Sequence, residues 1–283
     1  MNKAIYQPKG KAREYSQWAC NLYVGCSNDC SYCFNKRGVL GPVLGGTVPT
    51  LKKAFKNEED AFETFIKELN QHRDAIIRDG GLLFSFSTDP CLPETIDLTM
   101  MCVSFATGMD VPCHILTKRS DWILGKGSYA LKFPTDKLVY LETLRSLKDH
   151  VSVGFTITGH DELEQNADLN YNRIMAMKGL HAFGIKTFAS IEPVITFERA
   201  AEYIRYAVPW CDLFKIGLLS GNKDAYSNYE MPQDLESFVH EVNELLTLKG
   251  KPVYWKRSVT DQLSYPLTDP CCVAQDFNIL KEQ

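Results

Sequence analysis

The sequence lacks a long apolar run, which a chain that crosses a membrane requires. A spanning helix needs about 18 or more apolar residues in succession, and the uncharged run of residues 39–51 is shorter than that and is broken by glycine and proline. The residues that follow Met1–Ala4 are polar, so the apolar core of a secretory signal is missing as well. We therefore expect no membrane association and a cytoplasmic location.

A strong charge of one sign is also missing. The 31 lysines and arginines face 35 aspartates and glutamates, which gives a net charge of −4, and 45% of the residues are hydrophobic. This balance excludes a disordered chain and a basic nucleic-acid-binding tail, but it leaves room for a local basic groove. Internal repeats, low-complexity tracts and an interdomain linker are absent too. Residues 1–283 are accordingly predicted to form one domain.

Short apolar runs alternate with helical patterns along most of the chain, as is typical of a parallel α/β fold. Six units of this kind fit either a partial barrel or a doubly wound sheet. The predicted strands are residues 82–88, 111–117, 151–158, 185–191, 211–218 and 253–255. The predicted helices are residues 57–79, 93–108, a segment around 141–147, 170–183, a segment after Thr196, and 232–246.

Several predicted strands alternate small polar residues with apolar ones, whereas strands buried on both faces are usually apolar throughout. In residues 151–158, Ser152, Gly154, Thr156 and Thr158 share one face of the strand. We predict that such faces line a lumen for a polar ligand, which favours a partial, open (β/α)6-type barrel; loose packing at strand ends is the alternative. Other polar residues placed in this way are Ser85, Ser87, Ser190 and Glu192.

Three of the ten cysteines, Cys26, Cys30 and Cys33, form a C-x₃-C-x₂-C arrangement. In a reducing compartment they are thiols or metal ligands rather than disulfides. Structural zinc usually takes four ligands in two pairs, and the adjacent Cys271 and Cys272 make a poor second pair. Three thiolates on one loop suit three corners of an iron–sulfur cubane whose fourth iron is open to a non-protein ligand. A zinc- or iron-binding structural module without turnover is the alternative.

The segment Gly25–Phe34, with an aromatic residue before its last cysteine, resembles the cluster loop of the radical S-adenosylmethionine (SAM) superfamily. The resemblance implies a partial (β/α) barrel with the cluster at its carboxyl-terminal mouth. Other segments resemble the spore photoproduct lyase-like, or DNA repair photolyase-like, group of that superfamily. These are residues 8–15, 21–26, 87–94, 115–118, 164–173, 184–185 and 193–195.

This resemblance implies the cofactors and the reaction. Cys26, Cys30 and Cys33 would bind three irons of a [4Fe-4S] cluster, and the amino and carboxylate groups of SAM would bind the fourth. An electron from an external donor such as flavodoxin or ferredoxin would cleave SAM into methionine and a 5′-deoxyadenosyl radical, which abstracts a substrate hydrogen. The protein would be an enzyme of lyase or transferase type.

The resemblance also implies which residues contact SAM. An aromatic residue of the cluster loop would lie beside the adenine, and polar residues at strand ends would reach the rest of the molecule. Helix capping or turn chemistry is the alternative role for the polar ones. The residues are Tyr32 for the adenine, Ser87, Thr88 and Asp89 for the amino group, and Thr156 and Glu192 for the ribose or the carboxylate.

Two positions depart from the lyases. In the lyases a cysteine that returns hydrogen to the repaired thymine stands where this chain has Phe86, and a tyrosine stands at Phe34. Cys91 is the nearby thiol and our candidate hydrogen donor; an inert buried thiol is the alternative. Lesion repair therefore does not follow from the resemblance.

Basic residues indicate the substrate class. The N-terminal arm, residues 1–20, carries four of them among tyrosines, and residues 34–56, long enough to form a lid, carry Lys36 and Arg37. Cations interleaved with aromatic rings suit DNA, RNA or a nucleotide, although a solvated surface has the same composition. A peptide or a small metabolite is the alternative substrate. Residues 220–283 are expected to form a C-terminal extension.

Overall fold

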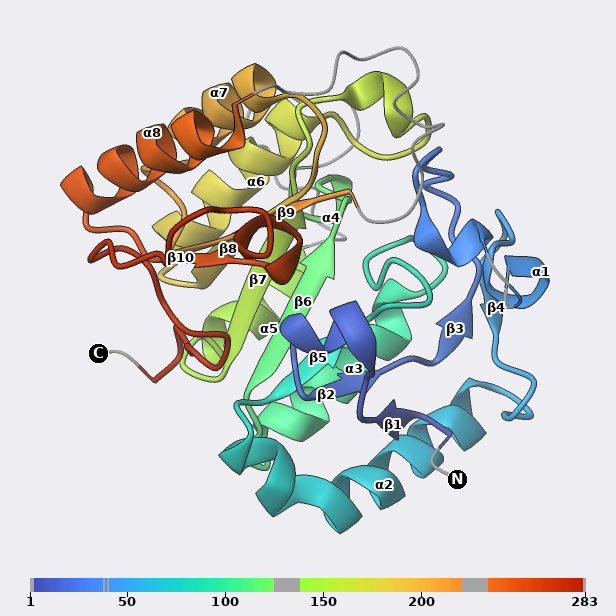
Figure 1. Ribbon diagram of the computed structural model, residues 1–283. Helices are drawn as coiled ribbons and strands as arrows, with labels where there is room; N and C mark the ends of the chain where they lie inside the picture. Colours follow the sequence, from blue (N-terminus) through green and yellow to red (C-terminus); the bar gives the residue numbers. More distant parts are fainter. Residues whose placement is uncertain (1–2, 38, 40, 125–137, 220–233, 282–283) are drawn as a thin grey trace.

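The structure is a computed structural model that describes residues 3–37, 39, 41–124, 138–219 and 234–281, and it is built on one eight-stranded sheet (Figure 1). The strand order is β1-β2-β5-β6-β7-β8-β9-β10, with β1 antiparallel to β2 and the other neighbours parallel. In the described part of the chain the two edge strands do not pair, so the predicted partial, open barrel is confirmed. The strands of this sheet are β1 (Ile5–Tyr6), β2 (Trp18–Cys20), β5 (Leu82–Phe84), β6 (Cys113–Thr117), β7 (Val151–Thr156), β8 (Lys186–Val194), β9 (Leu213–Leu218) and β10 (Val253–Trp255).

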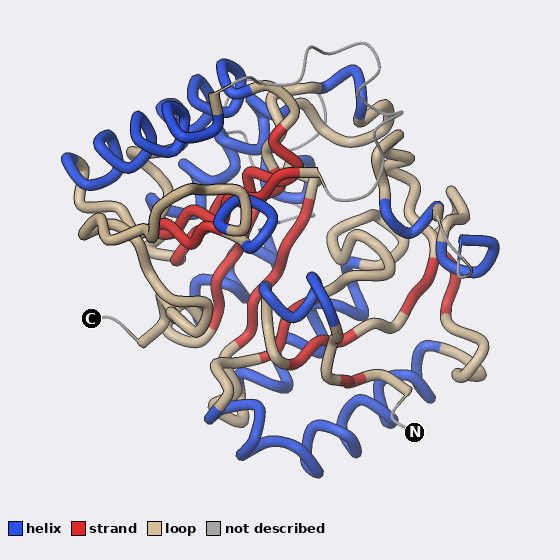
Figure 2. The backbone as a smooth tube through the Cα atoms, in the orientation of Figure 1, coloured by secondary structure: helices blue, strands red, loops and turns tan. Residues whose placement is uncertain are grey.

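Helices lie around the outside of the strands, as the ribbon and the tube both show (Figures 1 and 2). This is the arrangement that alternating strands and helices produce, because each crossover helix packs back on the sheet. Within the described residues the α-helices are α1 (Gly41–Leu44), α2 (Glu58–Arg78), α3 (Ile96–Thr107), α4 (Asp121–Leu124), α5 (Leu138–Ser146), α6 (Asn170–Ala182), α7 (Phe197–Ala207), α8 (Leu235–Leu248) and α9 (Arg257–Thr260).

Helix α2 illustrates how local sequence sets these elements. The Asn57 side chain caps it by accepting a hydrogen bond from the backbone N–H of Asp60 at 2.9 Å. Phe65, Leu69 and Ile76 share its buried face and are fully covered by the core. The helix therefore forms where capping and periodicity predict it.

The N-terminal arm contributes two strands that the sequence did not predict. β2 pairs in parallel with β5, and β1 pairs with β2, so residues 5–6 and 18–20 belong to the sheet. The Glu68 carboxylate of α2 fastens the arm by accepting hydrogen bonds from the backbone N–H groups of Ala4 and Ile5 at 2.9 and 2.8 Å. Strands of two or three residues carry no detectable periodicity, which is why they escaped prediction.

The predicted strand 82–88 is wrong in its second half, because β5 ends at Phe84. The Ser85 hydroxyl donates to the carbonyl of Thr88 at 2.7 Å, and the Asn21 side chain accepts from the backbone N–H of Phe86 at 2.8 Å. These side chains replace the ladder hydrogen bonds and turn the segment into a loop.

The predicted lumen is present, but two cavities occupy it instead of one. Ser152 of β7 lines a cavity at the amino ends of the strands, and Thr156 lines another at the carboxyl ends. Between them the chain has Gly154, where a Cβ atom would lie 2.2 Å from the ring of Phe188. The ring thus fills the middle of the barrel, and only glycine fits opposite it.

The predicted lid and extension are only partly described. Residues 34–56 contain α1 and strand β4 (Thr50–Leu51), which pairs with β3 (Tyr23–Val24) in a separate two-stranded sheet; residues 38 and 40 lie outside the described set. The extension holds α8, β10 and α9, and its residues 220–233 lie outside the described set. None of the described helices is long and apolar enough to cross a membrane.

Candidate active site

A cavity of about 700 Å³ opens at the carboxyl ends of the parallel strands, and we call it the carboxyl-end cavity. Polar groups from successive strand ends meet there because parallel strands finish at one edge of the barrel. The predicted site residues that line it are Cys26, Cys30, Cys33, Tyr32, Thr88, Asp89, Thr156 and Glu192.

The three cysteines of the loop after β3 all face this cavity. Cys30 is 6% exposed, and Cys26 and Cys33 are half-buried. Burial raises the pKa of the Cys26 thiol to about 12 and that of Cys30 to about 11. Without a metal these two thiols are protonated at neutral pH, so metal loading must displace protons.

Tyr32, between the last two cysteines, is anchored by a buried ion pair. Its hydroxyl donates to the Glu164 carboxylate, which also pairs with the Arg173 guanidinium at 2.7 Å. Neither charged side chain is exposed to solvent. Burial and the negative charge of Glu164 hold the pKa of Tyr32 well above its ordinary value. Separating a buried ion pair leaves an uncompensated charge in the protein interior, which is costly. The pair therefore holds Tyr32, and with it the cysteine loop, in one position.

Asp89 joins the cluster loop to the strand ends. One carboxylate oxygen accepts from the Cys91 backbone N–H at 2.9 Å and the Thr117 hydroxyl at 2.6 Å. The other accepts from the Asn28 side-chain amide at 2.8 Å and the Lys118 backbone N–H at 2.7 Å. A carboxylate can accept about four hydrogen bonds, so these four donors fill its acceptor sites. Direct contact of Asp89 with SAM stays a prediction.

The two residues before Asp89 differ in their surroundings. The Ser87 hydroxyl donates to the backbone carbonyl of Tyr23 at 2.5 Å, and Ser87 does not line the cavity. Thr88 lines the cavity, and its hydroxyl oxygen is buried with no hydrogen-bond partner in the described structure. Buried polar groups are normally paired, so Thr88 has a hydrogen bond left for a ligand.

Glu192, at the end of β8, belongs to a second polar group in the cavity. It accepts hydrogen bonds from the Tyr15 hydroxyl and from the Lys256 ammonium, and Lys256 lies over the Tyr15 ring. A Cβ atom at Gly217 would meet the Lys256 side chain at 2.8 Å and the Glu192 carboxylate at 3.1 Å. Glycine at this position of β9 is what lets the two charges pair. Thr156, the other predicted strand-end residue, lines the same cavity at the end of β7.

The candidate hydrogen donor lies behind this surface. Cys91 is 2% exposed and is not among the residues that line the cavity. Burial and the charge of Asp89 raise the pKa of its thiol well above the ordinary value. Phe86 lines the cavity instead, edge-on to the Tyr15 ring at 6.0 Å, and Phe34 lines it while remaining 65% exposed. The role of Cys91 stays a prediction.

Cations stand at the cavity rim. The lining residues include Lys9 and Lys11 of the N-terminal arm and Lys36 and Arg37 after the cluster loop. Lys36 pairs with Asp29, and the structure describes no ion pair for the other three. The predicted basic rim is therefore present, and it attracts negatively charged groups.

Three functional candidates escaped the sequence analysis as site residues. Tyr15 and Lys256 come from opposite ends of the chain, and Lys118 follows β6 with its ammonium 5.5 Å from the Tyr32 ring centroid. Burial lowers the pKa of Lys118, but the neighbouring Cys30 and Glu164 outweigh it, and the net shift is upward. No sequence motif links positions 15 and 256, which are far apart in the chain. Spacing along the chain therefore could not show that these side chains meet in one cavity.

The three thiols suit a cluster rather than a single metal ion. Among the described residues, no three His, Cys, Asp or Glu side chains converge on a single metal ion. A cubane cluster needs no such convergence, since each thiolate binds a different iron. Three thiols at one cavity, together with the unpaired Thr88 hydroxyl, fit a cluster with a polar ligand beside it.

No family model and no curated protein matches the sequence. A search of solved structures does find similar chains. A point mutant of spore photoproduct lyase aligns over 88% of this chain and 78% of its own, with a TM-score of 0.61 and 14% identity. Spore photoproduct lyase complexed with dinucleoside spore photoproduct aligns over 95% and 79%, with a TM-score of 0.56 and 13% identity. The chain therefore shares the fold of spore photoproduct lyase.

A second kind of radical SAM protein is similar as well. Streptococcus suis SuiB bound to S-adenosylmethionine aligns over 89% of this chain but 53% of its own, with a TM-score of 0.54 and 14% identity. This chain thus spans about half the length of SuiB. In a radical SAM fold, the carboxyl-end cavity lies where sites of β/α barrels form.

Proposed function

We propose that this protein is a radical SAM enzyme that acts on a nucleic acid or a nucleotide. The observation that carries the proposal is the shared cavity: three thiols on one loop, the unpaired Thr88 hydroxyl and the strand-end Glu192–Lys256 pair open into a single space at the carboxyl ends of the strands. Sequence motif and geometry agree on this one position. The structural zinc module does not account for the other groups.

The chain's own residues would do five things. Cys26, Cys30 and Cys33 would hold a [4Fe-4S] cluster, which with bound SAM supplies the radical that abstracts a substrate hydrogen. Asp89 braces the cluster loop against β6, and the Glu164–Arg173 pair fixes the Tyr32 ring between the cysteines. The Thr88 hydroxyl offers SAM a hydrogen bond. Glu192 and Lys256 face the cavity with opposite charges, which suits the charged or ribose end of a ligand.

The rim supports a negatively charged substrate. Lys9, Lys11 and Arg37 line the cavity without an ion pair in the described structure, and the exposed Phe34 ring stands among them. Phosphate groups bind such cations, and bases stack on such rings. The spore photoproduct lyase structure that holds a dinucleoside supports the same class.

A peptide is the second candidate, because solved structures of SuiB include one bound to its precursor peptide, SuiA, with a TM-score of 0.54. Salt distinguishes the two. Binding to phosphates weakens steeply as the salt concentration rises, because the counterions that the bound protein releases then gain less entropy. Nucleic-acid retention should therefore be lost between low and moderate salt. The triple variant Lys9→Met, Lys11→Met, Arg37→Met should lose that retention, and unchanged retention would favour the peptide.

The enzyme class is tested by reconstitution with iron and sulfide without oxygen. Wild-type protein should bind about four irons per chain, bind SAM, and form 5′-deoxyadenosine with a strong reductant; reduced flavodoxin or ferredoxin is the expected biological donor. Iron-loaded protein that fails to bind SAM would contradict the proposal. Cys91→Ala should leave SAM cleavage intact, and if Cys91 is the hydrogen donor it should block only product formation.

A further inference from the structure

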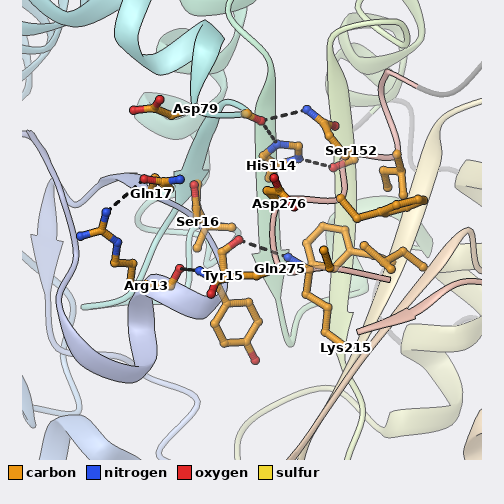
Figure 3. A pocket seen from close by; sticks show the side chains of 18 residues that line it. Arg13, Tyr15, Ser16, Gln17, Asp79, His114, Ser152, Lys215, Gln275 and Asp276 are labelled. Atoms are coloured by element: carbon orange, nitrogen blue, oxygen red, sulfur yellow. Dashed lines mark hydrogen bonds between the residues drawn. The ribbon is translucent and has the colours of Figure 1, made fainter. Parts of the chain in front are cut away.

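A second cavity occupies the opposite end of the barrel, and we call it the amino-end cavity. Its volume is about 450 Å³, within the range of small-molecule sites. Side chains from four strands point into it, His114, Ser152, Phe188 and Lys215, as Figure 3 shows for the labelled residues. Tyr15 lines both cavities and separates them.

The Lys215 ammonium lies on the wall of this cavity without a counter-charge. It donates one hydrogen bond, to the Tyr15 carbonyl at 3.1 Å, and lies 5.7 and 5.8 Å from the ring centroids of Tyr15 and Phe188. No aspartate or glutamate of the described chain forms an ion pair with it, whereas Lys256 has Glu192. The side chain is half-buried, and an ammonium group that loses part of its hydration without gaining a counter-charge is destabilised.

We infer that the amino-end cavity is a second ligand site, which takes a small organic anion with its carboxylate on Lys215. The anion would supply the missing counter-charge and accept the remaining N–H donors of the ammonium. This site is separate from the proposed SAM chemistry and does not depend on it.

Other groups of the cavity suit such a ligand. His114 is half-buried, and desolvation lowers its pKa to about 4, so it is neutral and adds no charge of its own. Its Nε2–H donates to the Gly80 carbonyl, so its Nδ1 accepts the Ser152 hydroxyl proton at 2.7 Å.

The cavity is bounded on one side by residues 274–279. The Gln275 side-chain amide donates to the Arg13 carbonyl at 2.9 Å, and the Asn278 amide donates to the Gly80 carbonyl at 3.0 Å (Figure 3). These bonds tie the C-terminal segment to the barrel wall and complete the site. A carboxylate of that segment, Asp276, is exposed at the margin of the cavity and pairs with no described cation.

Protonation of Lys215 gives the binding a defined pH dependence. Burial, and next the positive charge of Lys256, lower the pKa of Lys215 to about 7. An anion binds the charged form, so its affinity should weaken by up to about tenfold per pH unit above 7. The other charged or titratable groups that face Lys215 or its cavity are Arg13, Tyr15, Asp79, His114, Lys256 and Asp276.

The test is titration calorimetry of the full chain with malonate, with neutral malonamide as the matched ligand. Wild type should bind malonate and not malonamide, and Lys215→Met should weaken malonate binding at least tenfold. Lys186→Met removes a half-exposed charge from the same sheet, outside the cavity, and should change the affinity less than twofold. Neither cluster nor SAM is needed, so failure here leaves the proposed function untouched.

A measurement on the wild type guards against a variant that does not fold. Acylation of Lys215 by acetic anhydride, followed by mass spectrometry of peptides, should slow when malonate is present. Absence of malonate binding, equal binding of malonamide, or a loss in Lys36→Met that matches the loss in Lys215→Met would overturn the inference. The last result would place the anion at the rim of the carboxyl-end cavity instead.

Discussion

The two ends of the barrel each hold a lysine, and they surround it in different ways. At the carboxyl ends of the strands, Lys256 pairs with Glu192, and Gly217 leaves the room for that pair. At the amino ends, Lys215 faces a cavity with one carbonyl and two aromatic rings as neighbours. The protein neutralises one charge itself and leaves the other to be neutralised from outside. Both ends share Tyr15, whose ring separates them.

The difference shows what each end is built to accept. An ion pair costs little free energy while the cavity is empty. Its two charges can instead bind a ligand that carries groups of both signs, such as the amino and carboxylate groups of an amino acid. An unpaired ammonium favours one ligand charge only. The comparison is therefore tested by changes that affect one end and spare the other.

The largest effect is expected from Cys30→Ala. Two thiols cannot hold three corners of a cluster, so bound iron and 5′-deoxyadenosine formation should both be lost. Malonate affinity at the amino-end cavity should not change. Cys102→Ala, which removes a buried thiol of α3, is the control and should keep its iron on metal analysis. A Cys30→Ala protein with full iron content would contradict the site.

Arg173→Met should cost about 3–5 kcal/mol of unfolding free energy, because it removes the cation closest to the buried Glu164 carboxylate and leaves Lys118 at 4.0 Å. Chemical denaturation measures the loss. Adding Glu164→Gln should restore part of it, since the unpaired charge is then removed. Arg199→Met, which breaks an exposed pair with Glu202, should cost less than about 1 kcal/mol. Equal losses in the two single variants would show that the Tyr32 anchor is not an ion-pair effect.

Gly217→Ala should affect the carboxyl-end cavity alone. The new methyl group must displace Lys256 or Glu192, at a cost of about 1–3 kcal/mol of stability. SAM affinity should fall with it, while malonate affinity at the other end stays within twofold. A parallel loss at both ends would mean that Tyr15 transmits the change and that the two cavities are not independent.

The last effect is a gradual one, a slope in stability against pH that is small for each pH unit. Lys215 has a pKa of about 7 in the folded protein, below its ordinary value, so the unfolded chain binds more protons above pH 7. Stability should rise with pH from about 7 toward 10, by no more than about 1.4 kcal/mol per unit. Denaturation at several pH values should show a smaller slope for Lys215→Met. If the wild type and Lys215→Met had the same slope, the Lys215 ammonium would be hydrated in the folded protein and its pKa would be close to the ordinary value.

Much of this fold could be predicted from local sequence. Helix α2 follows from its Asn57 cap and its periodic face, and the polar alternation of residues 151–158 predicted a lumen that is present. The prediction of strands failed where the sequence pattern was too short to detect, or where side-chain hydrogen bonds from other segments ended a strand early. Strands β1 and β2 are too short to carry a period, and hydrogen bonds from Ser85 and Asn21 end β5 early.

The candidate site divides in the same way. Side-chain spacing identified the three cysteines, since cluster ligands on one loop are neighbours in sequence. Spacing could not show that the Asp89 carboxylate accepts hydrogen bonds from four protein donors, or that the Ser87 hydroxyl donates to the Tyr23 carbonyl. Those partners come from distant segments, and local sequence carries no information about distance in space.

By itself the sequence determined the alternation of strands and helices, the cysteine loop and the polar faces of the strands, because each depends on residues that are close along the chain. The tertiary structure alone decided that Phe188 fills the space beside Gly154 and divides the lumen, and that Lys256 meets Glu192 while Lys215 meets no carboxylate. Packing and charge pairing join residues far apart in the chain, so they exist only once the barrel has formed.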